Sequence, residues 1–258
     1  MRKSKLLAKL RASQTARICS MGHFLPFYVR YAAHFKYDAI WFDLEHRAFD
    51  PREVQAVLAL CHAYDIDCML RPSSTERNHL YRHLEDGATG FLVPFVDTPQ
   101  IAQHLINAAK YPPTGKRGID GAGLDADFGI DAWREGSTYY EDANRETFIV
   151  AQIETPEGLE NTEAIAALPG IDALFVGPSD LGHRLAVSNS GLSLEKAIAK
   201  VAAACDRHQK AWGLPAGSPA DLKRYQQMGS RLAIWGGDFS LINVLKTCSE
   251  QLDEAVGT

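Results

Sequence analysis

The sequence predicts an α/β protein built as a (β/α)8 barrel, and three observations lead to this prediction. Short apolar runs rich in β-branched and aromatic residues recur along the chain, and a segment with helical periodicity follows each of them. Eight such runs in 258 residues match the usual size of a (β/α)8 barrel. No Gly-x-Gly-x-x-Gly segment follows the first run, which disfavours a doubly wound dinucleotide-binding sheet. We therefore expect one barrel domain over residues 1–258.

The expected strands are the eight apolar runs themselves. In chain order they are Ala16–Cys19, Ala39–Asp43, Asp67–Arg71, Gly90–Val93, Phe148–Glu154, Ala173–Gly177, Ala211–Pro215 and Leu232–Trp235. N-cap residues or a first-turn proline mark helix starts between them, at Asp50-Pro51, Ser74-Thr75-Glu76, Thr98-Pro99 and Thr155-Pro156. The connection 111–147 is far longer than an ordinary link, and an insertion of this size is typical of a site or an interface.

The composition excludes several classes of function. Lys and Arg number 27 against 32 Asp and Glu, a net charge of −5, so no basic face for nucleic acid is expected. No apolar stretch approaches the roughly 20 residues that cross a membrane. The segment 1–10 is basic without the apolar centre of a signal peptide, so we expect an amphipathic helix in a cytoplasmic protein. None of the five cysteines forms a Cys-x-x-Cys pair, which indicates buried thiols in a reducing compartment.

Polar side chains gather where four of the expected strands end. In a (β/α)8 barrel the catalytic groups come from the C-terminal ends of the strands and the loops after them. The polar residues at these positions are Asp43, Glu45 and His46 after the second strand, Arg71 at the third, Gln152 and Glu154 at the fifth, and Asp180 after the sixth.

Glu154 and Asp180 are candidate metal ligands. Side chains alternate along a strand, so Gln152 and Glu154 both point into the barrel mouth, next to the sixth strand that leads to Asp180. Two converging carboxylates repel each other unless a cation lies between them. Oxygen ligands favour Mg²⁺ or Mn²⁺, with Co²⁺ or Zn²⁺ as alternatives. Either acid alone could instead form an ion pair with a neighbouring Arg or Lys.

His46 and Arg71 are candidates for catalysis. Asp43 lies three residues before His46 and could hold its imidazole in one tautomer, and such a pair suits proton transfer near neutral pH. Arg71 presents a permanent cation toward the mouth, where it suits a carboxylate or a developing enolate. The alternative role of Arg71 is an ion pair with Glu45 or Asp43.

Five motifs together resemble those of the class II (metal-dependent) pyruvate aldolases, the 4-hydroxy-2-oxoheptanedioate aldolase-like enzymes of the citrate lyase β-subunit-like superfamily. The motifs are Asp43-x-Glu45-His46, Arg71-Pro72, Tyr111-Pro112-Pro113-Thr114-Gly115-Lys116-Arg117-Gly118, Gln152-Ile153-Glu154 and Gly177-Pro178-Ser179-Asp180-Leu181. The resemblance extends over about residues 22–238. It implies a (β/α)8 barrel, a divalent metal ion, and a homo-oligomer, typically a hexamer built from dimers that exchange their last helix.

The resemblance also implies a role for each site residue. These roles are metal binding for Glu154 and Asp180, a polar contact near the substrate for Gln152, stabilisation of the enolate for Arg71, acid–base chemistry for His46 with Asp43, and binding of the pyruvate carboxylate by the backbone around Gly177, Ser179 and Asp180. Three segments, 21–26, 181–184 and 119–128, depart from the family pattern. We expect them where the aldehyde binds.

The expected reaction is the reversible cleavage of a 4-hydroxy-2-oxo acid to pyruvate and an aldehyde. No lysine ends a predicted strand, so a Schiff-base mechanism lacks its nucleophile. An alternative is a related lyase or synthase that acts on a CoA thioester or another enolpyruvate-forming substrate. A nucleotide tail would call for a basic surface at the mouth, for which only Lys116 and Arg117 are candidates. A catalytically silent scaffold would have lost site residues, and we see no such loss.

Overall fold

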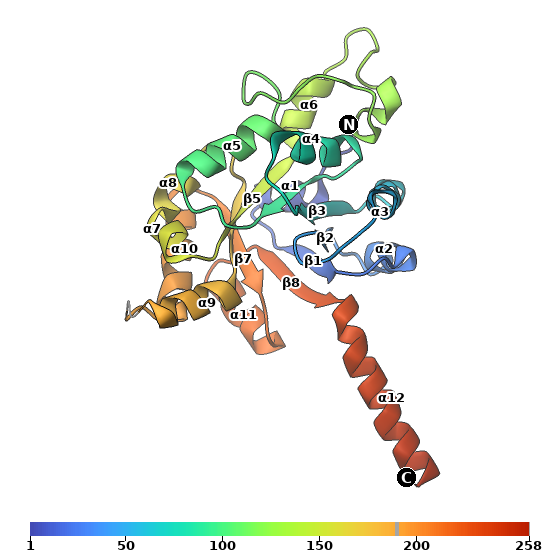
Figure 1. Cartoon of the computed structure of the whole chain (residues 1–258), viewed down its shortest axis with the longest axis vertical. Coiled ribbons are helices and arrows are strands. Elements are labelled where there is room, and N and C mark those ends of the chain that lie inside the picture. The colour runs from blue at the N-terminus through green and yellow to red at the C-terminus, as the bar shows by residue number, and fades with distance from the viewer. Residues whose placement is uncertain (189–190, 258) are drawn as a thin grey trace.

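The chain forms a closed barrel of eight parallel strands in the computed structural model, which describes residues 1–188 and 191–257 (Figure 1). Each strand pairs with the next, and β8 closes the ring against β1. The strands are β1 (Ala16–Met21), β2 (Ala39–Asp43), β3 (Asp67–Arg71), β4 (Gly90–Val93), β5 (Phe148–Ile153), β6 (Ala173–Val176), β7 (Ala211–Pro215) and β8 (Leu232–Gly237). The predicted fold is confirmed, and the predicted strand bounds differ from these by at most two residues, always at the C-terminal end.

Helices surround the barrel. They are α1 (Lys5–Arg11), α2 (Pro26–His34), α3 (Pro51–Ala63), α4 (Arg77–Glu85), α5 (Pro99–Ala109), α6 (Tyr139–Glu146), α7 (Pro156–Glu160), α8 (Thr162–Ala166), α9 (Pro178–Val187), α10 (Leu194–Arg207), α11 (Pro219–Gln227) and α12 (Leu241–Val256), with short 3-10 turns at Leu124–Gly129 and Asp238–Ser240. The predicted caps at Asp50, Thr98 and Thr155 each accept a backbone N–H of the following helix. No helix in the described part of the chain is long and apolar enough to cross a membrane.

The N-terminal helix closes the bottom of the barrel, the end from which the strands start. Leu6, Leu7 and Leu10 of α1 are buried and share one apolar cluster with inward-facing residues such as Ile18 and Met69. The predicted amphipathic helix is therefore part of the barrel core.

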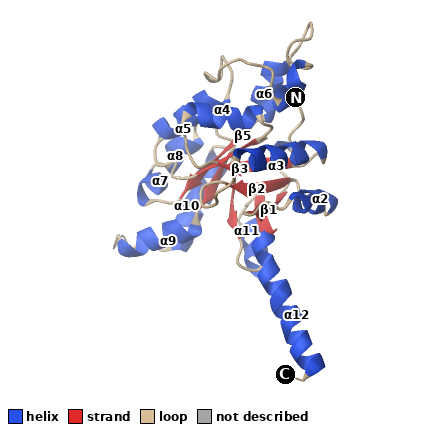
Figure 2. Ribbon diagram, turned by 45° about the vertical axis from the view of Figure 1, so that its right-hand side comes forward, coloured by secondary structure: helices blue, strands red, loops and turns tan. Residues whose placement is uncertain are grey.

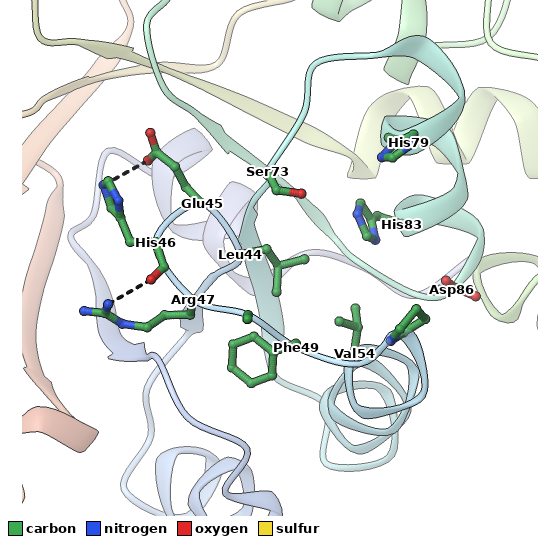
Figure 3. A pocket seen from close by; sticks show the side chains of 12 residues that line it. Leu44, Glu45, His46, Arg47, Phe49, Val54, Ser73, His79, His83 and Asp86 are labelled. Atoms are coloured by element: carbon green, nitrogen blue, oxygen red, sulfur yellow. Dashed lines mark hydrogen bonds and ion pairs between the residues drawn. The ribbon is translucent and has the colours of Figure 1, made fainter.

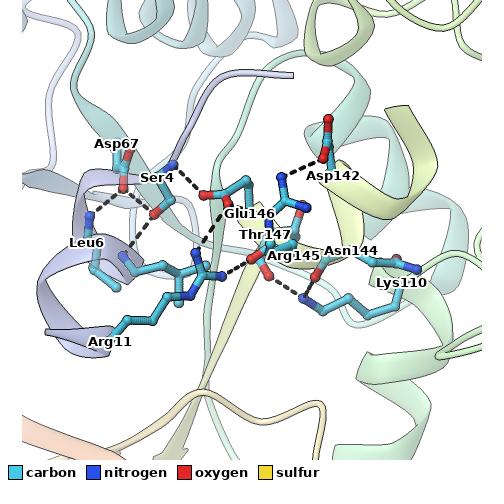
Figure 4. Close-up of polar contacts among 11 residues, drawn as sticks. Ser4, Leu6, Arg11, Asp67, Lys110, Asp142, Asn144, Arg145, Glu146 and Thr147 are labelled. Atoms are coloured by element: carbon cyan, nitrogen blue, oxygen red, sulfur yellow. Dashed lines mark hydrogen bonds and ion pairs between the residues drawn. The ribbon is translucent and has the colours of Figure 1, made fainter. Parts of the chain in front are cut away.

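A buried carboxylate fixes this helix to the barrel (Figure 4). Asp67, at the start of β3, accepts hydrogen bonds from the Ser4 hydroxyl at 2.6 Å and the Leu6 N–H at 2.8 Å. Its second oxygen lies 2.7 Å from the guanidinium of Arg2. Glu146, at the end of α6, receives the Ser4 N–H at 2.9 Å. Because the donors surround a carboxylate that is removed from water, they offset much of its desolvation cost.

The parallel register determines which side chains meet at the opposite end. Asp43 pairs with Arg71 across β2 and β3, and Ile153 pairs with Val176 across β5 and β6. The residue after Ile153, Glu154, therefore emerges beside Gly177. The barrel mouth brings both pairs of strand ends to one surface.

The insertion between α5 and β5 packs outside the barrel. Gly123 lies against the carbonyl of Glu85, and Leu124 lies against Gly87, both at the C-terminal end of α4 that leads to the bottom of the barrel. Figure 1 shows this segment beside α6 and the N-terminus, at the end of the molecule opposite α12. The segment 119–128 follows a helix that ends at the bottom face. The expectation that it lines the aldehyde site at the mouth of its own barrel is therefore wrong.

The last helix extends away from the barrel (Figure 2). All residues of α12 are exposed, among them Leu245 and Leu252. Trp235, on the outward face of β8, is 40% exposed, where the eighth helix of a (β/α)8 barrel would ordinarily cover it. All five cysteines are free, and four are buried as predicted, but Cys248 on α12 is exposed.

The Asp67 contacts predict a large effect of one substitution on stability. Asp67→Asn should lower the free energy of unfolding by about 3 kcal/mol, because it leaves buried donors without a charged partner. Asp65 provides a matched control, since it also pairs with Arg2 but is exposed. Asp65→Asn should lower the free energy of unfolding by less than about 1 kcal/mol. Urea titration of both variants measures the difference. Equal losses in the two variants would show that Asp67 does not anchor the helix.

Candidate functional site

The barrel mouth brings together the residues that the sequence predicts for the site. Asp43 and Arg71 come from β2 and β3, Gln152 and Glu154 from β5 and the residue after it, and Gly177, Ser179 and Asp180 from the turn into α9. His46 lies in the loop after β2.

Arg71 is held in one orientation by three contacts. Its Nε and Nη2 donate to the two carboxylate oxygens of Asp43 at 2.8 and 2.7 Å. Its Nη1 lies 3.1 Å from Oε2 of Glu45. The guanidinium also lies over the ring of Trp41, 4.8 Å from the ring centre. Such a bidentate and stacked guanidinium is rigid and presents its remaining donors in a fixed direction.

The predicted pairing of Asp43 with the His46 imidazole is not observed. The carboxylate of Asp43 accepts the backbone N–H groups of Glu45 at 3.1 Å and of His46 at 3.4 Å, in addition to the Arg71 contacts. The imidazole Nε2 of His46 lies instead 3.6 Å from Oε2 of Glu45, and its side chain is 58% exposed (Figure 3). The strand register aligns Asp43 with Arg71, so the carboxylate of Asp43 is already paired with a guanidinium. Glu45 is the acid beside His46.

Glu154 is almost fully buried and makes two hydrogen bonds. Its Oε1 accepts the backbone N–H of Phe95 at 2.8 Å, and its Oε2 accepts the side-chain amide of Gln152 at 2.5 Å. A Cβ atom on Gly177 would lie only 2.7 Å from Oε2 of Glu154. Glycine at 177 therefore leaves the space that this carboxylate occupies.

The mouth carries more negative than positive charge. Burial would raise the pKa of Asp43, but the hydrogen bonds and charge of Arg71 outweigh it and lower that pKa. Burial raises the pKa values of Glu45 and Glu154, and the charge of Asp180 raises both further. Glu45, Glu154 and Asp180 thus lie within electrostatic reach of one another. Arg71 pairs with both Asp43 and Glu45, so its single positive charge does not balance the acids of the mouth.

These residues fit a divalent cation. Glu154 and Asp180 supply oxygen ligands of the kind that Mg²⁺ and Mn²⁺ prefer, and their neighbour Gln152 has a buried Oε1 without a protein donor. That oxygen is available to accept a hydrogen bond from a ligand in the mouth. The described residues contain no group of three or more His, Cys, Asp or Glu side chains that could hold a metal ion. A cation bound by two carboxylates would keep positions for water and substrate, as Mg²⁺ sites usually do.

The first turn of α9 offers a site for an anion. Gly177 is the N-cap and Pro178 is the first helical residue, so the N–H groups of Ser179 and Asp180 have no acceptor within the helix. The N–H of Gly177 is used in a hydrogen bond to Ile153, at 3.1 Å, so only the later two amides are available. A carboxylate at this helix end would meet free donors and the positive end of the helix dipole.

A second cluster of polar groups lies at the rim between β8, β1 and β2. Asp238 is buried and accepts the N–H of Gly22 at 2.9 Å and the imidazole Nδ1 of His23 at 2.8 Å. The ring of Phe239 lies against His23, and the guanidinium of Arg47 lies over that ring at 4.9 Å. No carboxylate pairs with Arg47 in the described part of the chain. The predicted departure at 21–26 does therefore lie at the mouth, where His23 and Arg47 can donate to a polar ligand.

A cavity of about 550 Å³ lies next to the loop after β2 (Figure 3). The residues that line it include Leu44, Glu45, His46, Val54, His79 and His83. Arg71, Glu154 and Asp180 do not line it. The cavity is therefore adjacent to the candidate reaction site but is not that site.

Sequence reasoning missed several residues that shape the site. Glu45 stood within the Asp43-x-Glu45-His46 motif and was considered only as an alternative ion-pair partner of Arg71, not as the acid beside His46. Trp41 and Phe95 gave no signal, because each contributes through a contact that only the folded chain makes. Arg184, whose Nη2 lies 3.7 Å from Asp180, could be found from its helical i,i+4 spacing.

Comparison with known proteins agrees with this geometry. The family model described as HpcH/HpaI aldolase/citrate lyase matches residues 23–243. A hydroxypyruvate/pyruvate aldolase of Pseudomonas aeruginosa is 30% identical over 243 residues, covering 91% of this chain and 87% of the relative. A 5-keto-4-deoxy-D-glucarate aldolase of Klebsiella pneumoniae is 31% identical, and the match covers 85% of this chain and 83% of that aldolase. Among solved structures, an HpcH/HpaI aldolase from Desulfitobacterium hafniense has a TM-score of 0.86 at 28% identity, covering 96% of both chains.

Proposed function

The chain belongs to the HpcH/HpaI aldolase/citrate lyase family, and from this premise we propose that it is a metal-dependent aldolase. It would reversibly cleave a 4-hydroxy-2-oxo acid to pyruvate and an aldehyde. The observation that supports the proposal is the charge arrangement at the barrel mouth. There the buried Glu154 lies within electrostatic reach of Asp180, and Arg71 is held in place by Asp43.

The chain's own groups bind the 2-oxo acid end of the substrate. The Ser179 and Asp180 N–H groups would donate to its carboxylate, and Arg71 would donate a guanidinium N–H to the ketone oxygen. A divalent cation held by Glu154 and Asp180 would act as a Lewis acid that favours negative charge on that oxygen. Arg71 adds a second positive charge at the same atom. The geometry thus favours an enolate over the neutral ketone.

His46 would move the proton in the carbon–carbon step. In cleavage the 4-hydroxyl gives its proton to the imidazole, the C3–C4 bond breaks, and its electron pair remains on C3 as the enolate. The C4 carbon leaves as the aldehyde, and protonation of C3 gives pyruvate. Glu45 lies beside the imidazole and would stabilise its protonated form.

Two other mechanisms find no support in the arrangement. None of the eight strands ends in lysine, so the mouth lacks an amine at the position where a Schiff base would form. The basic pair proposed for a nucleotide tail lies in the insertion outside the barrel. There Arg117 is buried and donates to Asp125 at 2.7 Å. We therefore favour an aldol over a CoA thioester as the substrate.

We further propose that two copies of the chain exchange α12. The helix carries an exposed apolar stripe that includes Leu241, Leu245 and Leu252, while the outward face around Trp235 of β8 has no covering helix. One copy thus offers an apolar helix, and the other offers the position that such a helix would fill. Three dimers of this kind would make the expected hexamer.

The metal assignment predicts the behaviour of Glu154→Gln. The variant should lose most of its affinity for Mn²⁺ and its metal-dependent aldol cleavage, because one charged ligand is replaced by a neutral one. It should stay folded in thermal melts, since the carboxylate repulsion in the mouth is relieved. Glu157→Gln, three residues on and exposed, is the matched control and should bind Mn²⁺ normally. Wild-type Mn²⁺ affinity in Glu154→Gln would remove Glu154 from the ligand set.

His46→Ala should separate proton transfer from enolate formation. We expect aldol cleavage to fall roughly 10²–10⁴-fold, the range of general acid–base catalysis. Decarboxylation of oxaloacetate, which forms the same enolate without deprotonating a hydroxyl, should fall much less. Both rates are measured on the same metal-loaded preparation. Equal losses in the two reactions would mean that His46 supports the site in another way.

The exchange of α12 predicts the oligomeric state of two charge variants. Light scattering coupled to size exclusion should find a multimer for the natural chain and smaller species for Leu245→Lys, because a charge cannot be buried in the apolar contact. Asn243→Lys changes the opposite face of the helix and should leave the multimer intact. A monomeric natural chain would contradict the proposal.

A further inference from the structure

Phe95 has a backbone conformation that a phenylalanine rarely adopts. Its φ of 52° lies in the left-handed region, which glycine and asparagine tolerate and most other residues avoid. The residue lies two positions after the end of β4. A strained residue at the edge of a site indicates that the surrounding structure enforces the conformation.

The neighbouring residues hold this turn in place. The Val96 N–H donates to the Gln152 carbonyl at 3.3 Å. The carboxylate of Asp97 accepts the Thr155 hydroxyl at 2.5 Å, and the Asp97 carbonyl accepts the Asn161 side chain at 2.7 Å. The strand that carries Glu154 and the helical segment after it therefore fix the turn from both sides.

The turn contacts Glu154 directly and is linked to Asp180 through Arg184. In its left-handed conformation Phe95 directs its N–H to Oε1 of Glu154, at 2.8 Å. Its ring lies under the guanidinium of Arg184, 5.4 Å from the ring centre, and Arg184 in turn lies 3.7 Å from Asp180. One residue thus reaches Glu154 through its backbone and Asp180 through its ring and Arg184.

We propose that Phe95 is a positioning residue that sets the affinity of the metal site. Its N–H fixes one oxygen of Glu154, so that the carboxylate does not rotate when the cation binds. Its ring holds Arg184 at the edge of the mouth and thereby restricts Asp180. Contacts of this kind behind a metal ligand typically change metal affinity by 10–100-fold when they are lost. The inference rests on the proposed metal site and concerns how that site is held.

Two substitutions separate the backbone contact from the ring contact. Phe95→Asn and Phe95→Val both remove the ring, but asparagine tolerates the left-handed backbone and the β-branched valine does not. The readout is the dissociation constant of Mn²⁺ without substrate, from the electron paramagnetic resonance signal of the free ion. We expect about a twofold weakening for Phe95→Asn, since an exposed ion pair contributes little. Phe95→Val should bind roughly tenfold or more weakly.

Further variants keep the test decisive. Phe95→Ala should fall between the other two, so the contrast with Phe95→Asn remains if Phe95→Val fails to fold. Arg184→Lys keeps the positive charge beside Asp180 but loses the planar group over the ring, so it should reproduce the twofold effect and add nothing to Phe95→Asn. Gln209 also has a left-handed backbone, with φ of 54°, but lies at the bottom of the barrel, so Gln209→Val is the control for strain alone. It should lower stability and leave Mn²⁺ binding unchanged.

The outcomes distinguish this inference from the function on which it rests. Equal Mn²⁺ affinity in folded Phe95→Ala and Phe95→Asn would overturn the backbone role, as would an equal loss in Gln209→Val. If Glu154→Gln loses Mn²⁺ while every Phe95 variant retains it, only the positioning role is wrong. If the natural chain does not bind Mn²⁺, the metal site is wrong and the positioning role is wrong with it.

Discussion

Hydrogen bonding around a closed ring of eight parallel strands is the constraint on which the rest of this structure depends. In such a ring each strand must keep one register with both neighbours, so the heights of all strand ends are fixed together. That register places Asp43 beside Arg71, and Glu154 beside the glycine at 177. Because side chains alternate between the two faces of a strand, every second residue of each strand then points into the barrel. The site is therefore specified by strand pairing before any of its own contacts form.

The two ends of the barrel solve the problem of buried charge differently. At the bottom, Asp67 is surrounded by donors from Arg2, Ser4 and Leu6, and these contacts join the first helix to the barrel. At the mouth, Glu154 has only neutral donors, and the nearby Glu45 and Asp180 raise its pKa in addition to burial. The first arrangement is complete within the chain and serves stability. The second lacks a positive partner, and this difference in charge balance separates a structural acid from one suited to bind a cation.

The sequence was sufficient to predict the barrel, and it predicted polar residues at strand ends that the fold places at the barrel mouth. Short apolar runs rich in β-branched and aromatic residues predicted the strands, and polar residues at the ends of these runs predicted Arg71 and Glu154 as site residues. The partner of His46 was wrong, because spacing along the chain suggested Asp43 while the pairing of β2 with β3 had already committed Asp43 to Arg71. The loop 119–128 was misplaced because its composition does not reveal at which end of the barrel it emerges. Contacts across the fold, like those of Phe95, leave no pattern in the sequence.

The hydrogen bond that the left-handed turn at Phe95 makes outweighs the cost of its strained backbone even before a cation binds. A left-handed backbone costs a residue with a side chain about 1–2 kcal/mol. Without the Phe95 N–H, Oε1 of the buried Glu154 would lose its hydrogen bond, and an unsatisfied buried group costs about 1–3 kcal/mol, more when it is charged. Because Glu154 is a carboxylate, the second cost exceeds the first. The turn therefore persists in the free protein, and Glu154 already has a fixed orientation when a ligand arrives. Pre-organisation of this kind removes an ordering cost from binding, which is why a residue outside the reaction site can influence it.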